Sequence, residues 1–323
     1  MILKGQNFRI LVFDEAAEKF KCVGMSTNCT ITHNANTEDA SYKNIVGLAT
    51  QPTVVSQNWS VQVDSIAVTD TTAMLRAIKN LTPFTLLWDE TSTTDNQTPL
   101  GAAFARSGVA WLSDATFQFD DRTNSTKSLQ FTGTSGLSTL TAAPEFEAVT
   151  PRAYTKGQFV RLYLGSDNTA TPATVIAAAK TLSLHVSLTL ESATTKDTPG
   201  TWDVQEPTAL SYDISTSALM RGADDITSAV GAKTLADIEA IKEAGEPVKW
   251  QIALTSGDNQ RTKNDVLVGG SCLITQLQIQ GPDRQNATYN AQLTGYGPYI
   301  LPDYNPTFSQ IVGGSSQSAQ VGA

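Results

Sequence analysis

Residues 270–295 read GSCLITQLQIQGPDRQNATYNAQLTG, and residues 108–133 read GVAWLSDATFQFDDRTNSTKSLQFTG. Both ends of the first stretch lie 162 positions after those of the second. In each copy apolar and polar residues alternate, and a period of two is typical of a β-strand with one face on a core. A polar run that begins Asp-Arg, at Asp121 and again at Asp283, then leads into a second alternating run. Each copy is therefore predicted to be a β-hairpin.

Other segments also occur twice. Lys4-Gly5-Gln6 and Lys156-Gly157-Gln158 each precede an apolar, strand-like run. Later in each half, apolar residues at helical spacing of three and four predict one short helix per half. These helical positions are Met74, Leu75 and Ile78 in one half and Leu235, Ile238 and Ile241 in the other. We predict a mainly β chain of two tandem domains of the β-sandwich or barrel type, each with one short α-helix.

The length of 323 residues suits two domains of about 150 residues each. We expect a first domain over residues 1–140, a linker over 141–155 and a second domain over 156–302. Residues 303–323 are predicted to be a C-terminal tail, flexible in part, because Gly313 to Ser318 is a polar run with little apolar surface to bury.

The chain is acidic, with a formal net charge of -9 and a pI near 4.7. Proteins that hold nucleic acid need clustered Lys and Arg, so we expect no specific nucleic-acid binding. The odd set Cys22, Cys29 and Cys272 argues against a disulfide framework. The N-terminal residues indicate neither a signal peptide nor a membrane span.

Catalytic signatures are weak. His33 and His185 each lie in an alternating strand-like run without a nucleophile motif nearby, which favours ordinary strand residues over a catalytic base. No segment brings together three metal ligands, and no phosphate-binding glycine loop occurs. We therefore expect no enzyme activity, no metal and no cofactor.

Two segments carry a resemblance to a known family. The run from Glu191 to Trp202, with Thr, Lys and Asp followed by Gly and Trp, resembles the loop of phage major tail proteins, the tail tube subunits. The closing hairpin, Gly270 to Gly295, is similar to the last two strands of that family. The resemblance covers the second half well, whereas in the first half it depends on Gly108 to Gly133 and a shortened loop at Thr37-Glu38-Asp39.

This resemblance implies a structural virion protein whose rings stack into the tail tube that conducts phage DNA to the host. With two tail tube domains in one chain, three chains would form a pseudo-hexameric ring. The other partners implied are the tape measure and further tail proteins, with DNA passing unbound, in a virion tail assembled in the bacterial host cytoplasm.

Two sets of site residues follow. Polar positions of one long alternating run are candidates for the lining of the bore: Ser183, His185, Ser187 and Thr189. A long loop that contains a Trp suits an interface, because Trp often dominates interface energetics. The candidates for contact with the next ring are Thr194, Thr195, Lys196, Asp197, Pro199, Gly200 and Trp202.

Two alternatives stay open. One is another virion tail component of the same fold, such as a distal tail or terminator protein. The other is a tandem β-sandwich protein for carbohydrate binding or adhesion, against which the lack of a signal peptide and of an aromatic platform counts. Growth of rings or filaments by the purified protein separates the second alternative from the tail tube.

Overall fold

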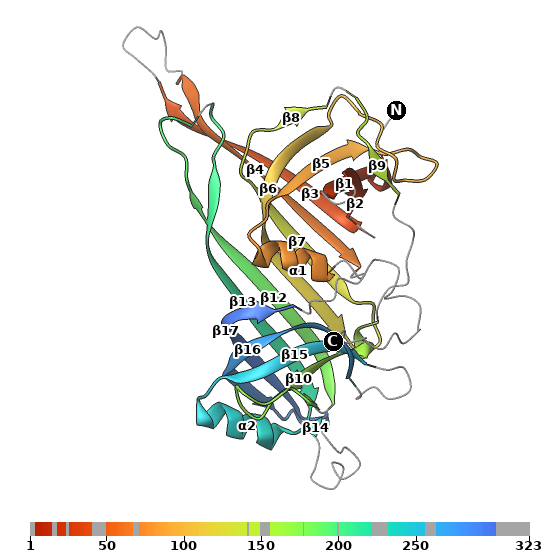
Figure 1. The fold of residues 1–323 in the computed structure, drawn as a ribbon, viewed down its shortest axis with the longest axis vertical. Coiled ribbons are helices and arrows are strands. Elements are labelled where there is room, and N and C mark those ends of the chain that lie inside the picture. The colour runs from red at the N-terminus through yellow and green to blue at the C-terminus, as the bar shows by residue number, and fades with distance from the viewer. Residues whose placement is uncertain are drawn as a thin grey trace, which may run out of the picture.

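The computed structural model describes residues 4–14, 18–23, 26–40, 50–66, 71–140, 142–148, 156–176, 178–198, 200–220, 232–255 and 263–301. Within these residues it is mainly β with two α-helices, so the predicted mainly β class is confirmed, whereas the two-domain arrangement stays a prediction. The chain forms two lobes, and two long strands of the second half extend along the first (Figure 1).

In the described part of the first half there are nine strands, one 3₁₀ turn and one helix. In order they are η1 (Gly5–Asn7), β1 (Phe8–Asp14), β2 (Lys19–Cys22), β3 (Ser26–Asp39), β4 (Pro52–Ile66), α1 (Thr71–Lys79), β5 (Phe84–Glu90), β6 (Arg106–Asp120), β7 (Thr126–Gly133), β8 (Ser138–Thr139) and β9 (Phe146–Glu147). The second half contains η2 (Gly157–Phe159), β10 (Val160–Leu164), β11 (Thr174–Ile176), β12 (Ala179–Ser192), β13 (Gln205–Leu219), β14 (Ala232–Lys233), α2 (Leu235–Ala244), β15 (Val248–Thr255), β16 (Lys263–Gln280) and β17 (Thr288–Ile300).

Strand pairing follows the same order in both halves. In the first half the order is β1-β5-β6-β7-β4-β3, and in the second it is β10-β15-β16-β17-β13-β12. The two predicted hairpins are the antiparallel pairs β6–β7 and β16–β17, which confirms them. A common pairing order is what two copies of one unit would have, and duplication itself stays a prediction.

Four glycines at the ends of the repeated stretch have a packing role. A Cβ on Gly108 or Gly133 would lie 2.6 or 2.3 Å from the Trp59 ring, and one on Gly270 or Gly295 would lie 2.9 or 2.7 Å from Tyr212. Each aromatic residue therefore rests on two adjacent strands that lack side chains at the contact. A hydrogen bond fixes each ring, from Trp59 Nε1 to the Ser135 carbonyl (2.7 Å) and from the Tyr212 hydroxyl to the Ser271 carbonyl (2.6 Å).

The core lies on the apolar side of the long strands. In the first half, Val61, Phe117 and Phe131 of the long strands are buried in the same apolar cluster as Leu86 and Trp88 of β5. The two predicted helices are confirmed, and α2 begins with a capping box between Thr234 and Asp237 and ends at Gly245, whose φ of 68° suits glycine. One apolar cluster runs through both halves without a break.

The halves join through main-chain hydrogen bonds as well as through the core. Strand β12 pairs antiparallel with β6, from Thr181 opposite Asp120 to Ser187 opposite Asp114. The eight long strands β3-β4-β7-β6-β12-β13-β17-β16 thereby form one continuous antiparallel sheet.

The predicted boundaries remain predictions, with one observation that bears on the linker. Strand β9, inside the range 141–155, pairs in parallel with β2, so that part of the predicted linker lies in the first-half sheet. The predicted tail, residues 303–323, lies outside the described residues. Neither described helix is long and apolar enough to span a bilayer.

Candidate functional site: a polar face shared by both halves

The eight long strands present one polar face, opposite the core. Neighbouring strands place polar residues directly opposite one another across the whole sheet, for example Thr32 with Ser60, Thr116 with His185, and Ser215 with Gln292. We call this surface the polar face. It consists of Asn28, Thr30, Thr32, Asn34, Asn58, Ser60, Gln62, Asp64, Ser128, Gln130, Thr132, Asp114, Thr116, Gln118, Ser183, His185, Ser187, Thr189, Ser211, Asp213, Ser215, Ser217, Asn290, Gln292, Thr294, Gln276, Gln278 and Gln280.

The charge of the polar face is negative. Its ionisable residues are three aspartates, Asp64, Asp114 and Asp213, together with His185. Neither Lys nor Arg occupies any of the positions that define this face. A polyanion beside this surface therefore meets hydroxyls, amides and carboxylates, and it meets no fixed cation apart from the imidazole when that is protonated.

The four predicted bore residues all lie on this face. Ser183, His185 and Ser187 are half-buried and Thr189 is exposed, whereas their neighbours Leu184 and Val186 point into the core. The alternation along β12 thus places the polar residues on the polar face and the apolar residues in the core, as the sequence indicated. That this face lines a bore stays a prediction.

His185 bridges two carboxylates that come from different halves of the chain. Its Nε2 lies 2.5 Å from Asp114 Oδ2 on β6, and its Nδ1 lies 2.9 Å from Asp213 Oδ1 on β13. A neutral imidazole carries only one N–H, so both contacts are hydrogen bonds only when the ring is protonated. Partial burial alone would lower the pKa of His185, but the hydrogen bonds to Asp213 and Asp114 and their charges raise it above its ordinary value.

A second set of contacts attaches the β12–β13 hairpin to the first half. The Thr134 hydroxyl donates to the Gln205 carbonyl (2.8 Å) and accepts from the Gln205 amide (3.0 Å). Trp111 Nε1 donates to the same carbonyl, also at 2.8 Å. The main chain at Gln205 is therefore held by two side chains that sequence reasoning did not single out.

The predicted interface loop is attached to the same chain at one end. The main-chain N–H of Gln57 donates to the main-chain carbonyl of Thr201 (2.6 Å), and the main-chain N–H of Asp203 donates to the main-chain carbonyl of Gln57 (2.9 Å). Trp202 is half-buried, and a Cβ on Gly136 would lie 2.8 Å from its ring. The tip from Thr194 to Asp197, with Gly200, contains mostly exposed residues, and Pro199 lies outside the described residues.

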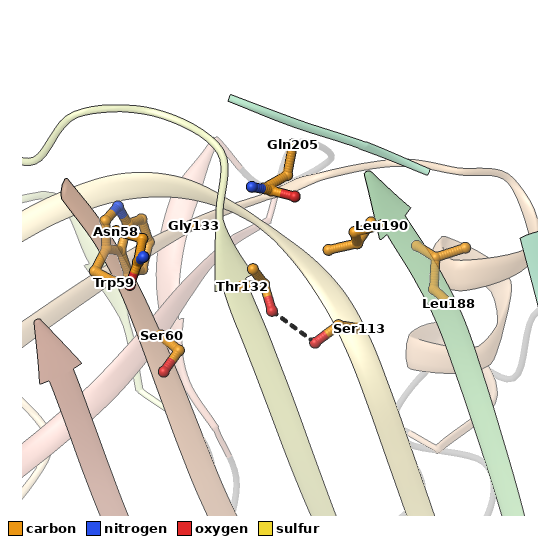
Figure 2. A pocket seen from close by; sticks show the side chains of 9 residues that line it. All are labelled: Asn58, Trp59, Ser60, Ser113, Thr132, Gly133, Leu188, Leu190 and Gln205. Carbon is orange, nitrogen blue, oxygen red and sulfur yellow. Dashed lines mark hydrogen bonds between the residues drawn. The ribbon is translucent and has the colours of Figure 1, made fainter. Parts of the chain in front are cut away.

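A pocket of about 370 Å³ opens where β12 diverges from β6. Leu188 and Leu190 of β12 form one wall, and Ser113, Thr132 and Trp59 belong to the first half (Figure 2). The hydroxyls of Ser113 and Thr132 are 2.9 Å apart and satisfy each other. This space has no buried charged group, and within the described residues no cluster of three or more His, Cys, Asp or Glu could hold a metal ion.

Sequence reasoning missed Asp114 and Asp213 as partners of His185. Both aspartates occupy polar positions of alternating runs, and this alternation was the signal that could have placed them on the same face as His185. The pairing of β6 with β12 joins segments about 70 residues apart and has no local signature in the sequence. The two histidines do not occupy equivalent positions. By strand register Thr32, not His33, occupies in β3 the position that His185 occupies in β12.

Fold and polar face together define a mainly β protein whose long strands separate an apolar core from a continuous, acidic, polar surface. Residues 156–300 match the model of a family described as phage tail tube protein. This segment covers nearly all of the second half, and the match agrees with the resemblance found in the sequence. A structural role in a tail tube is the function this match supports.

Solved structures that are similar to part of this chain include the following three. One is the tail of an empty GTA particle with C6 symmetry, at 17% identity and a TM-score of 0.34, covering 46% of this chain and 98% of that chain. Another is the virion of a native gene transfer agent particle, at 16% identity and a TM-score of 0.32 with the same coverage. The SPP1 tail tube has 13% identity and a TM-score of 0.33, covering 46% of this chain and 82% of that chain. No curated protein matches the sequence.

Proposed function

We propose that this protein is the subunit of a phage tail tube, a structural virion protein without enzyme activity that self-associates into stacked rings. The single observation that carries the proposal is the family match over residues 156–300. The continuous eight-stranded sheet supports it, because an open sheet with long edge strands is stable in solution only when its edges are paired or protected.

The polar face suits the lining of a bore through which DNA passes. Duplex DNA carries one negative charge per about 1.7 Å of axis, so Lys and Arg on the lining would hold it through many counterion-releasing contacts. The polar face offers Ser, Thr, Asn, Gln and three aspartates in their place. We assign Ser183, His185, Ser187 and Thr189 to this lining, with DNA passing without specific binding.

The ring contains three chains in this proposal. Each half contributes four long strands to the shared sheet in the same pairing order, so three chains supply six similar units in alternation. Stacked rings then form the tail of the virion, assembled in the host cytoplasm around a tape measure protein. Support for the trimer comes from the pairing order and from the closed cyclic symmetry usual in oligomers.

Contact between rings is assigned to the tip of the β12–β13 hairpin. Anchoring of Trp202 on Gly136 and of Thr201 on Gln57 leaves the segment from Thr194 to Gly200 as the part available to another ring. We propose that this tip makes the stacking contact. Deletion of residues 195–200 retains the anchor and should give soluble rings that do not stack.

Electron microscopy of the purified protein tests the function. Tubes of stacked rings with a central channel are the expected result, and native mass measurement should give three chains in an isolated ring. A monodisperse monomer at all concentrations and salt conditions would contradict the tail tube assignment. Six chains per ring would contradict the trimer alone.

A further inference from the structure

We propose that the contact between His185 and Asp114 selects the register in which β12 pairs with β6, so that His185 is a positioning residue for the whole second half. The inference concerns how one chain aligns its own two halves, and it does not depend on the tail tube assignment. An error of two residues would displace the second half by about 7 Å along β6, because a strand rises about 3.4 Å per residue.

No short turn sets the register of this pairing. The loop of a hairpin fixes how its two strands align, but the end of β6 at Asp120 and the start of β12 at Ala179 are 59 positions apart. The pairing itself runs from Thr181 opposite Asp120 to Ser187 opposite Asp114. The side chains of these paired segments therefore have to distinguish the observed register from its neighbours.

The apolar alternation excludes most of the wrong registers. A shift by one residue would turn the apolar side of β12 to the polar face. A shift by two towards the start of β6 would set the polar Ser187 opposite the buried Leu112. This mismatch arises because the bulge between Leu112 and Asp114 changes which residues of β6 face the core.

A shift by two in the other direction is compatible with the alternation. It forms as many opposing pairs as the observed register, and it sets apolar residues opposite apolar ones: Leu184 with Phe119, Val186 with Phe117, and Leu188 with Ala115. These six residues are all buried in the present structure. Burial of apolar surface alone therefore does little to distinguish this shifted register from the observed one.

The ionic contact is what the shifted register loses. In the observed register His185 lies opposite Thr116, and its Nε2 reaches the next polar residue of β6, Asp114, at 2.5 Å from Oδ2. After the shift His185 would lie opposite Gln118, and the next polar residue in the same direction would be Thr116. A hydroxyl would thus replace the carboxylate beside Nε2, and Asp114 would face Thr189.

Asp213 holds the same ring in either register. It lies directly opposite His185 in the β12–β13 hairpin, with its Oδ1 2.9 Å from Nδ1, and the two strands of this hairpin would shift together against β6. By binding Nδ1, Asp213 directs Nε2 towards β6. The two carboxylates therefore have different roles, since Asp213 orients the ring and Asp114 selects the register.

The anchor at Gln205 does not make this selection. The Thr134 hydroxyl bonds only the main-chain carbonyl and N–H of Gln205, and every residue except proline has both groups. The two-residue shift would bring the main chain of Asp203 to Thr134 in place of that of Gln205. Since Asp203 offers the same two groups, this anchor is compatible with either register.

The selection should depend on pH. Partial burial lowers the pKa of His185, but the hydrogen bonds and charges of Asp213 and Asp114, which face the ring from β13 and β6, raise it above its ordinary value. The third carboxylate nearby, Asp120, pairs with Thr181 at the far end of β6. Selection is therefore strongest below the ordinary pKa of about 6.5, and it weakens as the pH rises through the raised folded-state pKa.

Paired cysteines report the register within one chain. Ser183→Cys with Gln118→Cys places two thiols directly opposite each other in the observed register, and Ser183→Cys with Asp120→Cys does so after the shift. The Cα separation of opposing antiparallel residues suits a disulfide. Both pairs are made in a background without the three native cysteines and refolded from urea. They are then oxidised under one common condition, and the intramolecular disulfide is quantified by peptide mass mapping.

With the bridge intact, refolding at pH 5.5 should give the disulfide of the observed register in at least tenfold excess over the shifted one. Asp114→Asn should raise the yield of the shifted disulfide at least fivefold. Asp213→Asn removes a carboxylate from the same imidazole and is the matched control, which should stay within twofold. Refolding at pH 9 should raise the shifted yield in the protein with His185, whereas His185→Gln should give a high yield at both pH values.

An equal rise in Asp114→Asn and Asp213→Asn would overturn the inference, because it would show that lost stability alone releases the register. So would the absence of the shifted disulfide from every variant, or its release by Trp202→Ala, which removes the ring packed on Gly136. If a variant does not refold, the comparison of pH 5.5 with pH 9 in the protein that retains the bridge still decides. Equal yields at the two pH values would then overturn the role of His185.

Discussion

His185 Nε2 and Asp114 Oδ2 lie 2.5 Å apart although the two residues belong to different halves of the chain, which the antiparallel pairing of β12 with β6 joins. Asp213 closes the bridge from the other side of the ring. The imidazole thus connects the sheet of the first half to that of the second on the polar face, and its protonation decides whether both contacts are hydrogen bonds.

The bridge should make stability depend on pH. The folded-state pKa of His185 is raised, so the bridge stabilises fully below the unfolded pKa of about 6.5, and this stabilisation is lost as the pH rises through the folded-state pKa. The side chain is 35% exposed, so solvent screening limits the effect to about 1 kcal/mol or less. Urea unfolding at pH 5.5 should show native protein more stable than His185→Gln, and the difference should vanish near pH 9. A difference that grows with pH would contradict this assignment.

Substitution of a glycine that packs against the Trp59 ring should strongly destabilise the folded protein. In Gly133→Ala the new Cβ would lie 2.3 Å from the Trp59 ring, and the overpacking should cost about 1–3 kcal/mol. Gly281→Ala, in the corresponding repeated stretch, has open space around the added carbon and should change stability by less than about 0.5 kcal/mol. Thermal unfolding of the two variants compares them, and similar melting temperatures would show that the ring can move away freely.

Thr134 should hold the β12–β13 hairpin through its hydroxyl. Thr134→Val keeps the shape but removes both hydrogen bonds to Gln205. The loss should cost about 1–3 kcal/mol because the Gln205 main-chain N–H is left without its acceptor, while Trp111 Nε1 still donates to the Gln205 carbonyl. Thr134→Ser retains the hydroxyl and is the matched control. Limited proteolysis near residues 194–201 should become faster in the Val variant only, and equal rates would place the anchor elsewhere.

Added positive charge on the polar face should retain DNA. Ser183→Lys places a cation on this face in every subunit, and each additional phosphate contact should steepen the salt dependence of DNA binding by about 0.9 in log–log slope. Ala236→Lys, at an exposed position on α2, is the control. DNA retention by assembled tubes at increasing salt is the measurement, and equal retention by both variants would show that the polar face does not meet DNA.

Much of the fold could be predicted from the sequence, because the spacing of apolar residues along each segment indicates whether it forms a strand or a helix. The alternation in β12 separated Ser183 and His185 from Leu184 and Val186, and the helical spacing of Leu235, Ile238 and Ile241 identified α2. Each of these signals comes from residues close together in the sequence, because one side of a single strand or helix is buried in the core.

The contacts between halves could not be predicted, because they depend on register between distant strands. Bulges shift the register of both long hairpins, between Asn36 and Thr37 in one and between Thr189 and Leu190 in the other, so counting along the sequence misaligns them. The anchoring of Trp202 on Gly136 likewise depends on where β13 runs relative to the first half. No property of the Trp202 segment alone distinguishes this contact from one with another molecule.

The β6–β12 pairing has a consequence for how the protein responds to dilution. Because both strands belong to one polypeptide, each experiences the other at an effective concentration that does not change with the amount of protein, typically in the millimolar range for linked segments. A pairing between separate molecules dissociates on dilution, whereas this one persists. Covalent linkage also keeps the two unlike halves in equal number, so a cell that makes this chain can never produce one kind of unit in excess of the other.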